Sequence, residues 1–130
     1  MIKLLNRLKI LRDYYCKDIK ASGLPVELMI EITNKCNLHC IMCTRQKMKR
    51  AIGFMDFKLF KKIIDESAKF LELVYLHGLG EPLFHPKLKE MIQYARQKKL
   101  AVGLSTNATL LTKKLSLELY QYICLDNFTL

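Results

Sequence analysis

The sequence predicts an α/β fold in which parallel strands alternate with helices. Two observations support this prediction: short apolar runs of the strand type recur along the chain, and each is followed by apolar residues at helical spacing. Repeated strand, loop and helix units imply parallel strands joined by right-handed crossovers, as in a (β/α) barrel. The 130 residues provide about three to four such units after an N-terminal helix, which makes a partial barrel.

Residues 1–24 are predicted to form a basic amphipathic helix and the turn that ends it. Leucines and Tyr15 recur at helical spacing among lysines and arginines, and Ser22-Gly-Leu-Pro25 stops the pattern. We expect the apolar side of this helix to pack over the side or the open end of the barrel, in preference to an anionic membrane. The barrel units are expected over residues 25–130.

The barrel elements follow one another along the rest of the chain. Alternating or continuous apolar runs predict four strands, at 26–32, 73–76, 101–104 and 128–130. Three helices are predicted to begin at an N-cap Asp56, at Pro86 in a first helical position, and at a second N-cap, Thr112. Each helix carries apolar residues at i, i+3 and i+4 spacing, which gives it one face for the core.

Composition narrows the class of protein. Half of the residues are hydrophobic, so the chain is expected to bury a core. Its net charge is +10. The apolar residues near the start are interrupted by charges, and no apolar run is long enough to cross a membrane. An odd number of cysteines, three of them crowded together, favours a metal site in a reducing compartment over a disulfide framework. We therefore expect a cytoplasmic protein.

The crowded cysteines form the segment Cys36-Asn-Leu-His-Cys40-Ile-Met-Cys43, directly after the first predicted strand. Thiolates select iron–sulfur clusters, zinc or Cu(I). A structural zinc site needs four ligands, commonly as two pairs, and here there is one CxxxCxxC with no second pair. Three thiolates on a cubane cluster would leave one iron without a protein ligand. Cys16 and Cys124 are isolated and are interpreted as small buried or half-buried side chains.

Two further polar segments follow strands. The turn Gly78-Leu-Gly80-Glu81-Pro82 follows the second strand, and Ser105-Thr-Asn107 follows the third. Because parallel strands end at the same edge of a sheet, both segments should meet the cysteine loop there.

Together these segments resemble the radical S-adenosylmethionine (SAM) superfamily over about residues 25–130. The similarity lies in Glu31 to Cys43, in Gly78 to Pro86 and in Leu104 to Leu111, and it is greatest to the peptide-modifying and cofactor-maturing members. The resemblance implies a partial barrel of the radical SAM type. It also implies a 4Fe-4S cluster whose open iron binds S-adenosylmethionine and cleaves it reductively, so that a 5′-deoxyadenosyl radical removes hydrogen from a substrate.

The resemblance also assigns residues and partners. It implies that the cluster ligands are Cys36, Cys40 and Cys43. It places Met42 against adenine, Gly78, Gly80 and Glu81 near the methionine amino group, and Ser105 and Asn107 near cofactor or substrate. It implies an electron donor such as flavodoxin or ferredoxin, and a substrate that is a peptide, a nucleoside or a small metabolite.

Two departures from the family pattern are visible. Ala108 stands where family members often have glycine after the Thr-Asn pair. The chain also ends at Leu130, where family members continue, so we expect either a fragment of a longer protein or a chain that pairs with another. A truncated, catalytically silent iron–sulfur fragment is therefore the main alternative to an active enzyme. A small zinc or nucleic-acid-binding module is the third hypothesis.

Several residues near these motifs have an ordinary structural interpretation. The three histidines, His39, His77 and His85, are expected to be hydrogen-bonded structural residues. Glu31 has two equal interpretations, a substrate contact and a solvated strand carboxylate. The basic run Arg45–Arg50 is interpreted as a solvated loop rather than as a site for an acidic substrate, phosphate or RNA.

Overall fold

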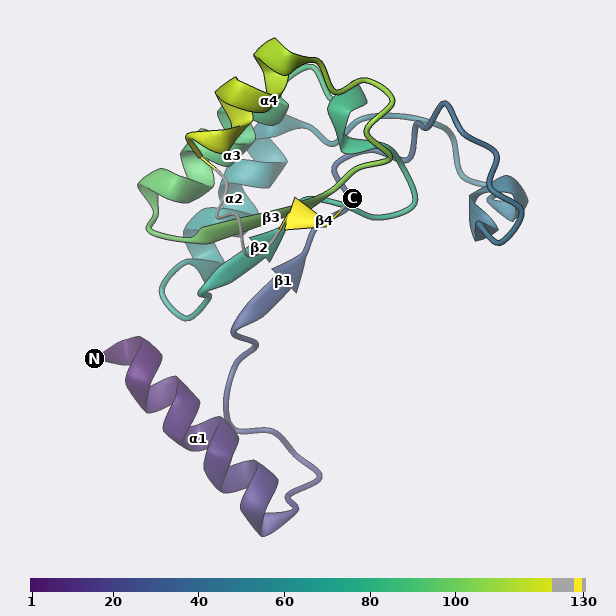
Figure 1. Ribbon diagram of the computed structural model, residues 1–130. Coiled ribbons are helices and arrows are strands. Elements are labelled where there is room, and N and C mark those ends of the chain that lie inside the picture. The colour runs from purple at the N-terminus through teal and green to yellow at the C-terminus, as the bar shows by residue number, and fades with distance from the viewer. Residues whose placement is uncertain (123–127, 130) are drawn as a thin grey trace.

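The computed structural model describes residues 1–122 and 128–129, and it contains one parallel sheet in the strand order β1-β2-β3-β4 (Figure 1). The predicted α/β fold, with parallel strands joined by helices, is confirmed. The strands are β1 (Glu27–Met29), β2 (Leu73–Tyr75), β3 (Ala101–Ser105) and β4 (Phe128–Thr129). The helices are α1 (Ile2–Cys16), α2 (Phe57–Ser67), α3 (Leu88–Gln97) and α4 (Lys113–Tyr120), with short 3-10 helices η1 (Thr44–Lys47) and η2 (Pro82–Phe84).

Helices α2, α3 and α4 lie together on one face of the sheet (Figure 1). The core lies between them and the strands, where Val74, Leu76 and Val102 are fully buried against side chains such as Phe60 and Ile64. Side chains alternate between the two faces of a strand, so the residues between these point to the opposite face. That opposite face is the side that would be the interior of a closed barrel.

The N-terminal helix differs from its prediction. Helix α1 ends at Cys16, because Lys17 takes a left-handed conformation with φ 55° and caps it. The leucines that were expected to pack on the barrel are all more than half exposed: Leu4, Leu5, Leu8 and Leu11. The helix instead turns polar residues inward, and Asn6 and Asp13 hydrogen-bond the backbone of residues 22–24. Figure 1 shows α1 apart from the helices that cover the sheet.

The first strand is shorter than the predicted span 26–32. β1 pairs with β2 only over Glu27–Met29, and one further backbone bond joins the Ile30 amide to the Tyr75 carbonyl at 2.8 Å. The chain then pairs on its other side, where Thr33 forms an antiparallel bridge with Phe54. The burial of Ile30 and Ile32 confirms the predicted alternation.

Two helix starts are confirmed and one is wrong. The Asp56 carboxylate accepts hydrogen bonds from the first turn of α2, and Thr112 caps α4 in the same way. Pro86 does not open α3. Residues 85–88 form a turn, closed by the Leu88 amide on the His85 carbonyl at 3.1 Å, so the helix begins two residues later.

The remaining strands lie close to their predicted spans. β2 ends one residue early and β3 extends one residue further, to Ser105. β4 pairs in parallel with β3 through Phe128 and Thr129, as predicted, whereas Leu130, Cys124 and Ile123 lie outside the described residues.

Candidate functional site

Three separate segments line one cavity of about 310 Å³ at the carboxyl ends of the strands. The sequence predicted that the cysteine loop, the glycine turn after β2 and the segment after β3 would meet there, and the structure confirms it. The lining residues are Cys36, Leu38, Cys40, Cys43, His77, Gly78, Leu79, Gly80, Glu81, Ser105, Thr106 and Asn107. Every predicted site residue except Met42 is among them.

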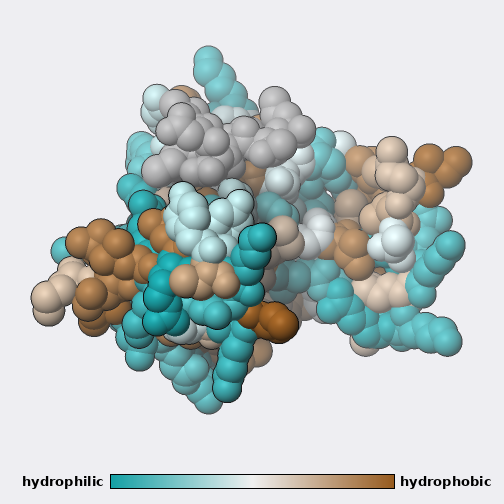
Figure 2. All heavy atoms as spheres, turned by 90° about the horizontal axis from the view of Figure 1, so that it is seen from below, coloured by the Kyte–Doolittle hydropathy of each residue, from teal (hydrophilic) through white to brown (hydrophobic). Residues whose placement is uncertain are grey.

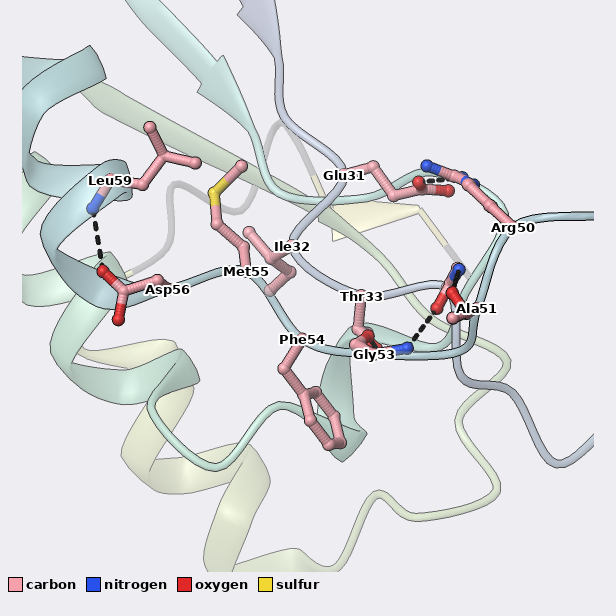
Figure 3. A pocket seen from close by; sticks show the side chains of 11 residues that line it. Glu31, Ile32, Thr33, Arg50, Ala51, Gly53, Phe54, Met55, Asp56 and Leu59 are labelled. Atoms are coloured by element: carbon pink, nitrogen blue, oxygen red, sulfur yellow. Dashed lines mark hydrogen bonds and ion pairs between the residues drawn. The ribbon is translucent and has the colours of Figure 1, made fainter.

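The cysteine loop is closed at its base by polar contacts. The Asn34 side chain donates to the Ala51 carbonyl at 2.8 Å and accepts from the Gly53 amide at 2.7 Å, so it joins residues on either side of the loop. The Thr33 hydroxyl donates to the Gly53 carbonyl at 2.8 Å. Glu31 forms an ion pair with Arg50. Figure 3 shows these residues around a second cavity of about 320 Å³, outside the cysteine cavity.

No sequence pattern points to Asn34 as part of this clamp. Its signal in the sequence is only an amide two residues before Cys36, and the partner backbone lies 17 to 19 residues further along the chain. Beyond the clamp, the loop projects from the body of the molecule (Figure 1). In Figure 2 the same projection, on the right, carries both apolar and hydrophilic side chains.

The three cysteines are free thiols that face one cavity. Cys40 is exposed and Cys36 and Cys43 are half-buried. Two donors lie near the Cys36 sulfur: the Leu38 amide at 3.4 Å and the Asn107 side-chain nitrogen at 3.7 Å. Hydrogen bonds of this kind tune cluster thiolates.

This donor set fits a cubane cluster. Among the described residues, no three His, Cys, Asp or Glu side chains are grouped to hold a single metal ion. Three thiolates that face one cavity match the number of protein ligands on a cubane that keeps one iron open, whereas a structural zinc site needs a fourth ligand.

The two glycines of the turn allow close packing against the end of the first strand. A Cβ on Gly80 would lie 2.2 Å from the Thr33 carbonyl oxygen, which is backbone and cannot move aside. A Cβ on Gly78 would lie 2.6 Å from the Glu31 side chain. Both glycines line the cavity, but the contact that requires them is with Thr33 and Glu31.

Glu81 is buried, with only 2% of its surface exposed, and its carboxylate is fully engaged. One oxygen accepts from the Thr106 hydroxyl at 2.7 Å and from the Leu83 amide at 3.0 Å. The other accepts from the Asn107 amide at 2.7 Å. Glu81 therefore fastens the turn after β2 to the segment after β3. Thr106, which the sequence analysis did not select, completes this contact.

The segment after β3 also connects to the cysteine loop. The Asn107 side chain donates to Asn37 at 3.1 Å, and Asn37 donates to the Thr109 hydroxyl at 2.7 Å. Ala108 takes a left-handed conformation with φ 59°. This is the position where the family often has glycine, and the conformation explains that preference.

Met42 lies away from the cavity. Its side chain is 82% exposed, beside Ile41 at 98%, and it does not line the pocket. Cys16 is exposed on α1, so the prediction of a buried or half-buried thiol was wrong there.

The three histidines differ from one another. His85 is buried and hydrogen-bonded on both ring nitrogens, by the Met55 carbonyl and the Lys87 amide, as predicted for a structural residue. His39 is exposed. His77 contradicts its prediction, because its buried Nδ1 has no hydrogen-bond partner among the described residues. Burial lowers the pKa of His77, which favours the neutral ring.

Two arginines of the basic run are used inside the loop. Arg45 donates to the Leu38 carbonyl at 2.8 Å, and Arg50 pairs with Glu31. Glu31 also accepts from the Leu79 amide at 2.9 Å, so its carboxylate has protein partners on both sides. These contacts give Arg45 a structural role within the loop, and Arg50 and Glu31 a structural role at its base.

Comparison with known proteins gives similarity to enzymes of one superfamily. The chain is 44% identical over 94 residues to the tungsten-containing aldehyde ferredoxin oxidoreductase cofactor-modifying protein of Pyrococcus furiosus, covering 71% of this chain and 26% of that protein. It is 33% identical over 96 residues to the mycofactocin maturase MftC of Mycobacterium tuberculosis, covering 73% of this chain and 24% of the relative. The chain thus spans about a quarter of the length of these relatives.

The fold of the chain is similar to that of a solved structure. BtrN in complex with AdoMet and 2-DOIA superimposes with a TM-score of 0.71 at 25% identity, over 77% of this chain and 43% of BtrN. The family model of the radical SAM superfamily matches residues 30–130, which include the cysteine loop and both polar segments that meet it. The chain therefore belongs to the radical SAM superfamily.

Proposed function

We propose that residues 25–130 form the cluster- and SAM-binding part of a radical SAM enzyme, and that residues 1–24 are an appended helix. The observation that carries the proposal is the cavity in which Cys36, Cys40 and Cys43 face the ends of β2 and β3. A cubane cluster held by three cysteines keeps one iron open for a ligand. When bound there, such a cluster supplies the electron that splits S-adenosylmethionine into methionine and a 5′-deoxyadenosyl radical.

The residues of the chain would position the cofactors. Cys36, Cys40 and Cys43 are the proposed cluster ligands, and the clamp of Asn34 on Gly53 holds the ends of their loop. Backbone groups of Gly78 and Gly80 face the cavity and could receive the methionine amino group.

Glu81 acts in this proposal as a positioning residue, because all of its hydrogen bonds are made to protein. Ser105 and Asn107 are the proposed contacts from the third strand. Met42 would reach adenine only if the loop brought it closer than its present exposed position.

The substrate is proposed from the relatives alone. A cofactor-modifying protein and a maturase are among them, which supports a role in modifying or maturing another molecule. No helix among the described residues is long and apolar enough to cross a membrane. An electron donor of the flavodoxin or ferredoxin type and a cytoplasmic location remain part of the proposal.

Electron paramagnetic resonance tests the proposal directly. The chain is reconstituted with iron and sulfide without oxygen, reduced, and measured with and without S-adenosylmethionine. We expect a four-iron signal that changes when S-adenosylmethionine is added, together with release of 5′-deoxyadenosine. A four-iron signal that does not change when S-adenosylmethionine is added would support the catalytically silent iron–sulfur fragment. A colourless protein with stoichiometric zinc would refute the proposed iron–sulfur cluster.

A further inference from the structure

His77 follows β2 on the inner face of the sheet and lines the cysteine cavity. Val74 and Leu76 of the same run are fully buried on the helix side, so Tyr75 and His77 point to the opposite face. The ring centroids of Tyr75 and His77 lie 5.3 Å apart, so the Tyr75 ring packs against the imidazole and restricts its position. Both His77 and Ser105 line the cavity, at the ends of the neighbouring strands β2 and β3.

The hydrogen bonding of His77 selects one tautomer. Among the residues that the structure describes, its Nδ1 is the one buried side-chain nitrogen or oxygen without a partner. A buried N–H without an acceptor is rarer and more costly than an unused lone pair. The neutral ring should therefore carry its proton on Nε2 and use that N–H as a hydrogen-bond donor.

Three polar side chains of the cavity, Glu81, Thr106 and Asn107, already have partners. Glu81 and Thr106 bond each other, and Asn107 bonds Asn37. No lysine or arginine is among the lining residues in the described part of the chain. A carboxylate that enters this cavity therefore meets two side-chain donors with no partner of their own in the described residues, the ring of His77 and the hydroxyl of Ser105.

We propose that the Nε2–H of His77, with the Ser105 hydroxyl beside it, donates a hydrogen bond to the carboxylate of S-adenosylmethionine. This inference rests on the proposed function, because it needs S-adenosylmethionine in the cavity. It replaces the structural role that the sequence predicted for His77 with a ligand contact. It also gives a function to two half-buried side chains on the inner side of the sheet, those of His77 and Ser105.

Three proteins test the contact: the wild-type chain, His77→Phe and His77→Gln. Phenylalanine keeps a planar ring beside Tyr75 but removes the donor, whereas the glutamine amide nitrogen replaces Nε2. The affinity of each reconstituted protein is measured for S-adenosylmethionine and for its decarboxylated analogue, which keeps the amine and the sulfonium. Ser105→Ala is measured in the same way.

We expect His77→Phe to bind S-adenosylmethionine about tenfold more weakly, the effect of losing a hydrogen bond to a charged group. His77→Gln should recover most of that loss, and Ser105→Ala should show a smaller one. The affinity for the decarboxylated analogue should be equal in all of these proteins. Equal losses for both ligands, or no loss for either, would overturn the inference.

The tautomer is checked separately on the wild-type chain without metal, by ¹⁵N NMR of the imidazole nitrogens at neutral pH. A proton on Nε2 is expected, and a proton on Nδ1 would overturn the inference even where a variant fails to fold. A wild-type chain that holds its cluster but does not bind S-adenosylmethionine would refute the proposed function itself. That outcome is distinct, because it appears before any substitution at His77.

Discussion

The hydroxyl of Thr106 donates a hydrogen bond to the buried carboxylate of Glu81 at 2.7 Å, and this contact joins the turn after β2 to the segment after β3. The amide of Asn107 donates to the other carboxylate oxygen. One buried acidic side chain thus sets the relative position of two segments that line the cysteine cavity. Its removal should be felt in the fold as well as in the site.

Glu81→Ala should lower the free energy of unfolding by about 3 kcal/mol, because it leaves the donors of Thr106, Leu83 and Asn107 without an acceptor. Urea unfolding followed by circular dichroism measures the loss. Glu66→Ala, at an exposed position of α2, is the matched control and should change stability by less than about 0.5 kcal/mol. Equal effects of the two substitutions would show that the carboxylate is not buried as described.

Cys40→Ala should abolish cluster binding and the brown colour of the reconstituted protein, because a site with three thiolates loses one of them. Iron content and visible absorption measure this. Cys16→Ala removes an exposed thiol of α1, outside the cavity, and should retain the full iron content. Full iron in the Cys40 variant would show that the cysteine loop does not hold the cluster.

Ala108→Gly should raise the free energy of unfolding by about 0.5 to 1 kcal/mol. The left-handed conformation of alanine at φ 59° destabilises the folded state by about 1–2 kcal/mol, and glycine removes this strain. Glycine also has more conformational freedom in the unfolded chain, which offsets part of the stabilisation. Thermal unfolding measures the difference. Ala68→Gly, where φ is −56°, removes no such strain and should destabilise the protein. A loss of stability in both variants would exclude strain at Ala108.

The contact between α1 and residues 22–23 should depend on pH. The pKa of Asp13 is lowered to about 2, first by the Ser22 amide, then by its hydroxyl. Because the folded pKa lies below the ordinary 3.8, the stabilisation is complete above 3.8 and is lost as the pH falls through about 2.

NMR shifts of the Ser22 and Gly23 amides should report this titration. We expect a midpoint near 2 in the wild-type chain and no titration of these amides in Asp13→Asn. Asp18→Asn changes an exposed carboxylate nearby and should leave the midpoint in place. A midpoint near 3.8 would show that Ser22 does not hold the carboxylate.

Asn34→Ala should open the base of the cysteine loop, because the hydrogen bonds to Ala51 and Gly53 are both lost. Losing about 1.4 kcal/mol of local stability increases the open population about tenfold, so trypsin should cut the loop after Arg45 or Lys47 about tenfold faster. Asn34→Asp keeps the acceptor for Gly53 but loses the donor to Ala51, and its cleavage rate should be intermediate. Equal rates in all three proteins would contradict the clamp.

Local patterns were enough to predict the elements that depend on local chemistry. Asp56 and Thr112 were predicted as caps because an N-cap needs only a side chain and the next few amides. The meeting of the three loops followed from the direction of parallel strands alone. The prediction that Pro86 opens a helix was wrong, because the His85 side chain accepts a hydrogen bond from the Lys87 amide and holds these residues in a turn. A pattern of helical spacing does not contain this contact.

Contacts over long sequence separations were the part that could not be predicted. Asn34 and Gly53 are 19 residues apart, and Thr106 and Glu81 are 25 apart. Such pairs depend on how the loops cross in space. The prediction that the leucines of α1 are buried was wrong, because helical spacing indicates an apolar face but not whether another element covers it. Polar Asn6 and Asp13 form the contacts of this helix with residues 22–24.

The clamp at the base of the cysteine loop bears on the order of assembly. Asn34 and Thr33 hold Ala51 and Gly53 through amide and hydroxyl groups, and no cysteine takes part. The loss of conformational entropy that closes the loop should therefore occur during folding, before iron binds. In a zinc finger the metal itself drives folding. Here the polypeptide should fold first and receive the proposed cluster afterwards, in a loop whose ends are already joined.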